Sequence, residues 1–255
     1  FKIWINLFRD SIMKDNNYLV VIPSRMESVR LPKKPLIDIA GKSLIQRTCE
    51  QVAKAIPIEN FLVATNHHEI LNHVQNLGYN AELTSNDCLT GTDRVAEIAS
   101  RYSYDYYINV QGDEPLINPD DILKAVSSIK DFPNDILNGY AIINTAEDYY
   151  STTIPKVVFR PDKRLLYISR ANIPGNKENG FKKSWKQICI YVFPKQLLEE
   201  FKNKKNKTPL EELEDIEILR FLEMGFEVRM IEMSSNSIAV DVPEDINKVL
   251  KRLNE

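Results

Sequence analysis

The stretch Tyr18-Leu19-Val20-Val21-Ile22-Pro23 is a short, continuous apolar run. A run of this length without polar alternation is typical of a strand that is buried on both faces, as strands of parallel sheets are. A polar and basic loop follows it directly. Because ligands of open α/β sheets bind beyond the carboxyl ends of the strands, this loop is the first candidate for a binding site.

Helices and further strands alternate after this run. A helix is predicted from Ser43, which forms a capping box with Gln46, and a second helix over 67–77 ends at a glycine. Strands are predicted at 61–64 and 106–110. Strands that alternate with helices of about ten to fifteen residues indicate βαβ units. The sequence therefore predicts an α/β fold with a mostly parallel sheet.

The segment 148–193 has a different character. Two short extended runs, at 156–159 and 165–169, are separated by turn-forming residues, and a polar stretch follows at 175–186. We expect this segment to be a β-rich excursion from the α/β body.

The last fifty residues return to a helical pattern. One helix is predicted to begin after Thr208, with a proline at its first position and Glu211 completing a capping box, and to end at Gly225. A strand at 226–233 and a terminal helix at 243–253 follow.

Composition bounds the class of protein. The chain has 255 residues, of which 43% are hydrophobic and 27% charged, so it suits one large α/β domain or two modest ones. The formal net charge of −3 offers no basic surface for nucleic acid. Because only 8 residues are glycine, the chain has little material for a long glycine-rich phosphate loop, and side chains must do most of the binding of any nucleotide.

The cysteines and the first twelve residues give information on the cellular compartment of the protein. Three cysteines without close spacing argue against a disulfide framework or a zinc cluster, and favour a reducing cytoplasm. The apolar segment 1–12 is too short to insert across a membrane. We interpret it as an N-terminal extension to one domain at 13–255; a surface strip, an amphipathic segment and a misassigned gene start all stay open.

The loop after the first strand concentrates positive charge. Four cations fall within ten residues of this loop, which also contains two prolines: Arg25, Arg30, Lys33 and Lys34. Such a site suits a polyanion such as a triphosphate, whereas the alternative is a solvated basic loop. The prolines stiffen the loop directly after a core strand, which favours the phosphate interpretation.

Acids follow two other predicted strands. Asp113 and Glu114 lie in a tight turn after the strand at 106–110, and Asp241 lies where a strand meets a helix. One or two carboxylates are what Mg²⁺ takes from a protein when phosphate oxygens and waters complete its octahedron. The alternatives are an ordinary acidic turn for the first pair and a helix cap for Asp241.

These pieces occur in one order that resembles the 3-deoxy-manno-octulosonate cytidylyltransferases, the CMP-Kdo synthetases. The resemblance covers nearly everything from Tyr18 onward, and several separated motifs carry it: Ile22 to Leu36, Gly91-Thr92-Asp93-Arg94, Asn109 to Pro115, Leu166-Tyr167-Ile168-Ser169-Arg170-Ala171-Asn172-Ile173-Pro174, Thr208-Pro209-Leu210-Glu211 through Arg220, and Val240-Asp241-Val242-Pro243-Glu244-Asp245.

The resemblance implies a fold and an activity. The fold would be a Rossmann-like nucleotide-binding sheet with helices on both faces, of the nucleotide-diphospho-sugar transferase type, with a β-rich excursion through which homodimers form. The activity would be Mg²⁺-dependent transfer of CMP from CTP to the anomeric hydroxyl of 3-deoxy-manno-octulosonate (Kdo), releasing pyrophosphate, for lipopolysaccharide or capsule synthesis.

The resemblance also assigns residues. The two metal-binding and catalytic acids fall on Asp113 and Asp241, and the two catalytic phosphate-binding cations on Arg25 and Lys34. The nucleotide site would further contain Ser28, Arg94 and Gln111. The sugar acid would be bound by Arg170, Gln187, Tyr191, Glu214 and Glu217.

The acceptor side departs from the family pattern. Gln187 stands where the family usually has a histidine, and Ile218 where it has a glutamine. Loss of a polar contact can change substrate selectivity strongly. The acceptor is therefore Kdo, 8-amino-Kdo, another sugar acid or a phosphonate, and a non-catalytic nucleotide-binding homologue is the rival interpretation from another class.

Overall fold

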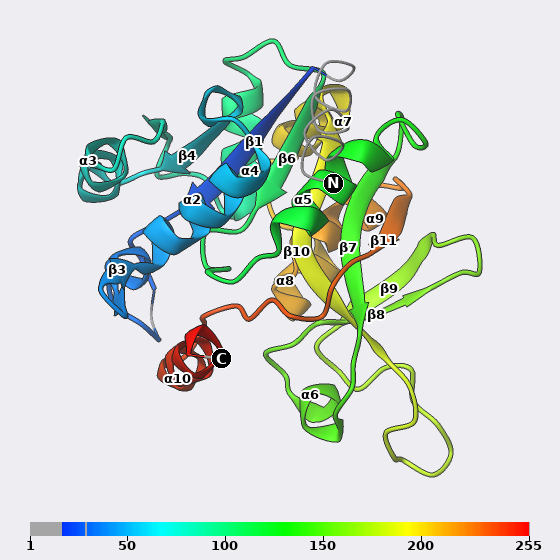
Figure 1. The fold of residues 1–255 in the computed structure, drawn as a ribbon. Coiled ribbons are helices and arrows are strands. Elements are labelled where there is room, and N and C mark those ends of the chain that lie inside the picture. The colour runs from blue at the N-terminus through cyan, green and yellow to red at the C-terminus, as the bar shows by residue number, and fades with distance from the viewer. Residues whose placement is uncertain (1–16, 29, 255) are drawn as a thin grey trace, which may run out of the picture.

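The computed structural model describes residues 17–28 and 30–254. Their main element is a nine-stranded sheet with the order β11-β7-β10-β6-β1-β4-β5, to which β8 and β9 are attached at β10 (Figure 1). The strands are β1 (Tyr18–Ser24), β4 (Phe61–Thr65), β5 (Ala81–Leu83), β6 (Tyr106–Val110), β7 (Ile136–Ile142), β8 (Lys156–Phe159), β9 (Leu165–Ser169), β10 (Trp185–Pro194) and β11 (Val228–Glu232).

The predicted parallel sheet is confirmed. β1 pairs in parallel with β4 and β6, β4 with β5, and β7 with β11, whereas β10 runs antiparallel to β6 and β7. All seven residues of β1 are buried, as its apolar run predicts. A strand of this kind needs cover on both faces, and helices provide it.

Two hydrophobic clusters lie on opposite faces of the sheet. Alternate residues of β1 point into each, with Val20 and Ile22 in one cluster and Leu19 and Val21 in the other. The first face is covered by α2 (Leu44–Ala55), α3 (His68–Asn76) and α5 (Pro119–Ser128). The second is covered by α4 (Gly91–Ala99), α7 (Lys195–Asn203) and α9 (Ile218–Glu223).

A third, smaller cluster anchors the C-terminal helix. Helix α10 (Pro243–Leu253) lies apart from the main layers, beside the hairpin of β2 (Asp38–Ile39) and β3 (Lys42–Ser43) (Figure 1). Val249 of α10 packs with Leu31, Ile39 and Val240. This contact brings the chain end next to the loop after β1, which contains the short 3₁₀ helix η1 (Lys34–Leu36). A second 3₁₀ turn, η2 (Ile58–Asn60), precedes β4.

The segment 148–193 divides between two places. β8 and β9 coincide with the predicted extended runs and form an antiparallel pair beyond the main sheet, after the short helix α6 (Ala146–Tyr150). β10, by contrast, runs between β6 and β7 inside the main sheet. The last part of this segment therefore belongs to the α/β body.

The prediction of a single helix after Thr208 is wrong. The structure breaks it into α8 (Pro209–Glu214) and α9, because Asp215 adopts a left-handed conformation with φ of +50°. Arg170 stabilises the break by donating hydrogen bonds to the carbonyls of Glu214 and Asp215. The break lets Glu217 turn towards the interior of the protein, as described below.

Only half of the capping box predicted at Ser43 forms. The Ser43 hydroxyl accepts a hydrogen bond from the Gln46 amide nitrogen, but the Gln46 side chain donates to Glu50. The predicted extension at 1–12 lies outside the described residues. No helix among residues 17–28 and 30–254 has both the length and the apolar character needed to cross a membrane.

Close packing at Gly139 generates a stability prediction. A Cβ atom on Gly139 would lie 2.9 Å from the carbonyl oxygen of Ile188 and 2.4 Å from the Met233 sulfur, so Gly139→Ala forces β7 away from β10. We expect it to lower the free energy of unfolding by about 1–3 kcal/mol, measured by urea denaturation. Gly180→Ala is the control, since no atom lies within 4 Å of its added Cβ. Equal stability of the two variants would contradict the packing.

Candidate active site

A cavity of about 990 Å³ lies at the carboxyl ends of β1 and β6. Its walls come from the loops after these two strands, the start of α4, the inner residues of β10, the loop before β8 and the segment 235–241. The location expected from the sheet topology is therefore confirmed. Most of the predicted site residues line this one cavity, namely Arg25, Ser28, Lys34, Arg94, Gln111, Asp113, Arg170, Gln187, Tyr191, Glu217 and Asp241.

A lysine and two aspartates meet in this cavity. The Lys34 ammonium lies 2.7 Å from Asp113 Oδ2 and 3.2 Å from Asp241 Oδ1. Arg30 adds a contact of 3.3 Å to the same Asp241 oxygen. Burial alone lowers the pKa of Lys34, but the two carboxylates outweigh it and hold that pKa above its ordinary value. The two acids, distant in sequence, thus share one cation.

Asp241 does not cap the helix that follows it. Asp245 Oδ2 instead accepts hydrogen bonds from the backbone nitrogens of Asp241 and Val242, at 3.0 and 3.1 Å. The Asp241 carboxylate is thereby left for Lys34 and Arg30. A backbone hydrogen bond from Val240 to the carbonyl of Asp113, at 2.9 Å, fixes the two aspartates beside one another.

Glu114 also helps to hold Asp113 and Asp241 beside one another. Its carboxylate is buried and accepts a hydrogen bond from the Ser237 hydroxyl, which joins the turn after β6 to the segment that carries Asp241. Burial, with a smaller contribution from the neighbouring Asp113 charge, raises the pKa of Glu114 to about 7. The sequence showed Glu114 as an acid of the turn but gave no sign of this contact, because Ser237 is 123 residues away.

The basic loop directs three of its four cations to the cavity. Arg25, Arg30 and Lys34 line it, whereas Lys33 turns outward to Glu69, at 3.0 Å. The Ser28 hydroxyl accepts a hydrogen bond from the Leu31 amide at 3.3 Å and so shapes the loop while also lining the cavity.

Arg94 and Gln111 lie on the wall formed by α4 and β6. Arg94 is buried, donates hydrogen bonds to Thr84 and Ser85, and has a pKa lowered by burial. Gln111 donates from Nε2 to Glu217 Oε1 at 2.6 Å. Both side chains are therefore held in place by neighbouring protein groups.

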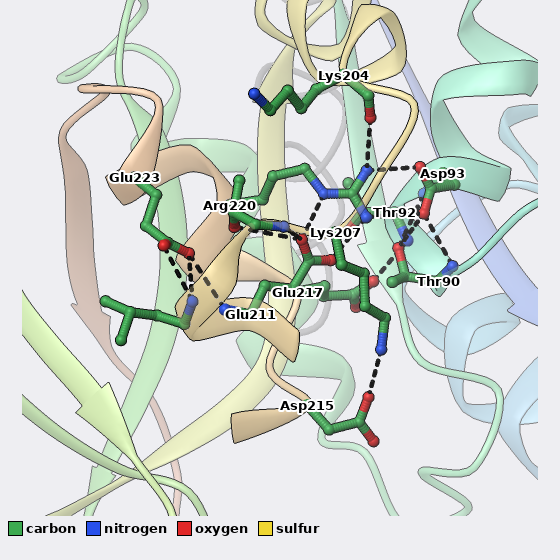
Figure 2. A network of polar contacts seen from close by, with 12 residues as sticks. Thr90, Thr92, Asp93, Lys204, Lys207, Glu211, Asp215, Glu217, Arg220 and Glu223 are labelled. Atoms are coloured by element: carbon green, nitrogen blue, oxygen red, sulfur yellow. Dashed lines mark hydrogen bonds and ion pairs between the residues drawn. The ribbon is translucent and has the colours of Figure 1, made fainter. Parts of the chain in front are cut away.

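A buried ion network orders this wall (Figure 2). Arg220 of α9 is fully buried and binds Glu211 of α8 through two parallel contacts of 2.6 Å. Its guanidinium also contacts Asp93 of α4 at 2.8 Å and stacks on the Phe201 ring at 3.9 Å. Paired, planar contacts of this kind are the strongest that an arginine makes with carboxylates. The network therefore ties three helices together across more than a hundred residues of sequence.

The same network positions Glu217. Asp93 accepts hydrogen bonds from the backbone and hydroxyl of Thr90 at the start of α4. In the first turn of the same helix, the backbone nitrogen of Thr92 donates to Glu217 Oε2 at 2.7 Å. Burial raises the pKa of Glu217. Asp93, Glu211 and Arg220 all belong to the motifs of the family resemblance. The network itself could not be predicted from the sequence, because no local pattern shows that α4 meets α8.

The predicted acceptor residues are distributed unevenly. Gln187 and Tyr191 line the cavity from β10, and burial raises the pKa of Tyr191. Arg170 also lines it, but its guanidinium already donates to the carbonyls of Thr152, Glu214 and Asp215.

The structure does not bring Glu214 into the cavity. Its carboxylate accepts hydrogen bonds from the hydroxyls of Tyr167 and Ser169 and from the backbone of Arg170, and so attaches α8 to β9. Ile218 does not face the cavity either, since it is buried in the hydrophobic cluster behind α9. The interpretation of Ile218 as a lost sugar contact is therefore wrong.

The site fits a magnesium ion by the chemistry of its donors. Among the described residues, no group of three or more His, Cys, Asp or Glu side chains could hold a metal by itself. Asp113 and Asp241 nevertheless flank a cation already, the Lys34 ammonium. Two carboxylates with room for phosphate oxygens are the set that Mg²⁺ uses in nucleotide sites.

An open, mostly parallel sheet with cations and acids opposed at its carboxyl edge defines a nucleotidyltransferase-like protein. A family model described as Cytidylyltransferase matches residues 19–234. The 3-deoxy-manno-octulosonate cytidylyltransferase of Geobacter sulfurreducens is 38% identical over 93% of this chain and 99% of its own. That of Protochlamydia amoebophila is 36% identical over 90% and 91%.

Solved structures agree with these relatives. A CMP:2-keto-3-deoxy-manno-octonic acid synthetase complexed with CTP matches with a TM-score of 0.84 and 31% identity, over 93% of this chain and 98% of that one. A putative glucose-1-phosphate thymidylyltransferase from Bacillus anthracis, 12% identical over 93% and 96% with a TM-score of 0.68, shares the fold. The chain belongs to the 3-deoxy-manno-octulosonate cytidylyltransferase family.

The buried network generates a second stability prediction. Arg220→Met leaves the Glu211 carboxylate, which is fully buried, without its cation. We expect the free energy of unfolding to fall by about 3–5 kcal/mol in chemical denaturation. Arg101→Met serves as the control and should cost within about 1 kcal/mol, because this arginine contacts Glu82 and Glu97 with its own side chain 38% exposed. A loss at Arg220 no larger than at Arg101 would show that the network does not hold the helices.

Proposed function

We propose that this protein transfers CMP from CTP to the anomeric hydroxyl of Kdo in a Mg²⁺-dependent reaction that releases pyrophosphate. The observation that carries the proposal is the Lys34 ammonium, held between Asp113 and Asp241 in the cavity. A site that gathers two acids and a cation at the carboxyl edge of the sheet suits a metal-bound triphosphate. Family membership supplies the nucleotide and the sugar acid.

Asp113 and Asp241 are the residues that would hold Mg²⁺. When bound, the ion would neutralise charge on the nucleotide phosphates and lower the pKa of the acceptor hydroxyl. Lys34 supports this placement because its ammonium occupies the position of a cation between the two carboxylates.

The cations of the first loop balance the remaining charge. An anionic sugar acid must approach an anionic nucleotide, so neutralisation and in-line positioning dominate the chemistry. Arg25 and Arg30 line the cavity together with Lys34. When CTP binds, Lys34 would turn from the aspartates to the phosphates. These three side chains would offset the charge that develops on the departing pyrophosphate.

The nucleotide and the acceptor are assigned to different residues of the cavity lining. Arg94, Gln111 and Ser28 lie on the side of α4 and the first loop, and we assign them to CTP. Gln187, Tyr191 and Arg170 lie on the side of β10 and β9, and we assign them to the sugar acid, although binding of its carboxylate by Arg170 requires exchange of the carbonyl contacts.

We further propose that the protein acts as a homodimer in the cytoplasm and supplies lipopolysaccharide or capsule synthesis. Among the described residues, β9 pairs with β8 alone, and Leu166 on it is 60% exposed, so this edge can accept a second copy. Cys49, Cys88 and Cys189 carry free thiols, as suits a reducing compartment.

One assay separates the candidate functions. Pyrophosphate release is measured with CTP, Mg²⁺ and a panel of Kdo, 8-amino-Kdo, other sugar acids and phosphonates. Release with Kdo supports the proposal. Release with another acid but not with Kdo would show that the other acid is the acceptor. Binding of CTP with no release across the whole panel would favour a non-catalytic homologue.

The two aspartates generate a prediction on turnover. Asp113→Asn and Asp241→Asn keep the size of the side chain but remove a charge from the metal site, so kcat should fall by about 10²–10³-fold or more. Thermal unfolding should stay close to that of the unchanged protein, because both carboxylates are partly exposed. Asp131→Asn, an exposed aspartate that does not line the cavity, is the control. A near-normal rate in either variant would remove that residue from the metal site.

Two neighbouring lysines provide a matched pair for metal binding. Lys34→Met leaves Asp113 and Asp241 without the ammonium between them, so the variant should melt earlier without metal and gain more from Mg²⁺ than the unchanged protein does. Lys33→Met, whose lysine pairs with Glu69 outside the cavity, should show the ordinary Mg²⁺ shift. Differential scanning calorimetry with and without Mg²⁺ measures both. Equal Mg²⁺ shifts in the two variants would argue against a metal between the aspartates.

A further inference from the structure

Strand β10 contains a bulge where it passes the cavity. Ile188 pairs with Gly139 of β7 and Tyr191 with Asn138, so β10 advances three residues while β7 advances one. Cys189 and Ile190 are the two residues without a partner on β7. Bulges of this kind re-aim side chains and need other partners for the backbone groups that lose the ladder.

Asn138 supplies those partners. Its side chain is 1% exposed, and Nδ2 donates to the carbonyl oxygens of Ile188 and Ile190, both at 3.1 Å. The third carbonyl of the bulge, that of Cys189, accepts a hydrogen bond from the backbone nitrogen of Gln111. Because a carbonyl oxygen can only accept, both hydrogens of the Asn138 amide are assigned, and the orientation of this amide is fixed.

The fixed amide of Asn138 determines the orientation of Gln187. Asn138 Oδ1 can only accept, and it lies 2.9 Å from Gln187 Nε2, which must therefore donate. The remaining polar atom of the Gln187 side chain is Oε1, which can only accept a hydrogen bond. Within the described part of the chain no donor bonds to this oxygen, and Gln187 lines the cavity on its acceptor side.

We propose that Asn138 is a positioning residue that holds Gln187 as a hydrogen-bond acceptor, so that the sugar group meeting Gln187 must be a donor, either a hydroxyl or a protonated amine. The inference rests on the proposed function and adds a specificity rule to it. An ether or a carbonyl at the same place would bring two acceptor oxygens together, and a methylene would leave Gln187 Oε1 buried without a partner, which is costly.

The rule is tested with a series of Kdo derivatives in which each hydroxyl other than the reacting anomeric one is replaced in turn by hydrogen, a methoxy group or an amino group. kcat/KM for each is measured by pyrophosphate release. At one position, the hydrogen and methoxy derivatives should lose about 10–100-fold, whereas the amino derivative stays within about 3-fold of Kdo. KM for CTP should not change along the series.

Two variants test whether Gln187 and Asn138 cause the preference for a hydroxyl over a methoxy group. Gln187→Leu removes the acceptor oxygen while Asn138 keeps both of its hydrogen bonds to the bulge carbonyls, and it should abolish the difference between hydroxyl and methoxy at that position. Asn138→Leu frees the Gln187 amide to turn, so it should shrink the same difference and raise KM for Kdo while KM for CTP stays within about 3-fold.

Asn80→Leu is the matched control. Asn80 also donates to two backbone carbonyls, those of Ile58 and Phe61, but it does not line the cavity. Its loss should lower stability and leave discrimination between the derivatives unchanged.

The outcomes separate the two proposals. Full discrimination retained in Gln187→Leu, or equal use of hydroxyl and methoxy derivatives by the unchanged protein at every position, would overturn the role of Asn138 and Gln187 while the proposed function stands. Absence of turnover by the unchanged protein with every acceptor would overturn the proposed function and this inference with it.

Discussion

The pairing of the fully buried Arg220 guanidinium with Glu211 and Asp93 is the interaction on which the geometry of the cavity depends (Figure 2). A buried charge is tolerated only when its partners are in place, so the three helices that carry these residues have one relative arrangement. That arrangement places the start of α4 against Glu217, and Glu217 in turn orients Gln111. One wall of the cavity is thus set by an ion network whose central residue, Arg220, does not itself line the cavity.

The opposite charges of the site are balanced before any ligand binds. A net charge of −3 conceals a basic loop and a pair of aspartates, and in the structure Lys34 brings the two together. This pairing stabilises two carboxylates that would otherwise repel one another across the cavity. A metal-bound nucleotide would therefore exchange one set of ion contacts for another and would not have to assemble a site from isolated charges.

The sequence was most informative where local pattern and fold agree. The apolar run at 18–23, the extended runs at 156–159 and 165–169 and the expectation of a cavity after β1 and β6 are all found in the structure. It failed where a distant contact overrides the local pattern. The helical pattern after Thr208 gives no sign that Arg170 and Glu217 favour a break at Asp215, and nothing near Glu214 shows that β9 occupies its carboxylate.

In the proposed reaction, Lys34 keeps the place of a metal between Asp113 and Asp241 and moves to a phosphate when the nucleotide binds. A crystal structure of the protein with Mg²⁺ and CTP tests this most directly. The account predicts a metal coordinated by both aspartates, with the Lys34 ammonium displaced onto a phosphate oxygen. A nucleotide bound in the cavity with Lys34 still bridging the aspartates and the metal elsewhere would contradict it.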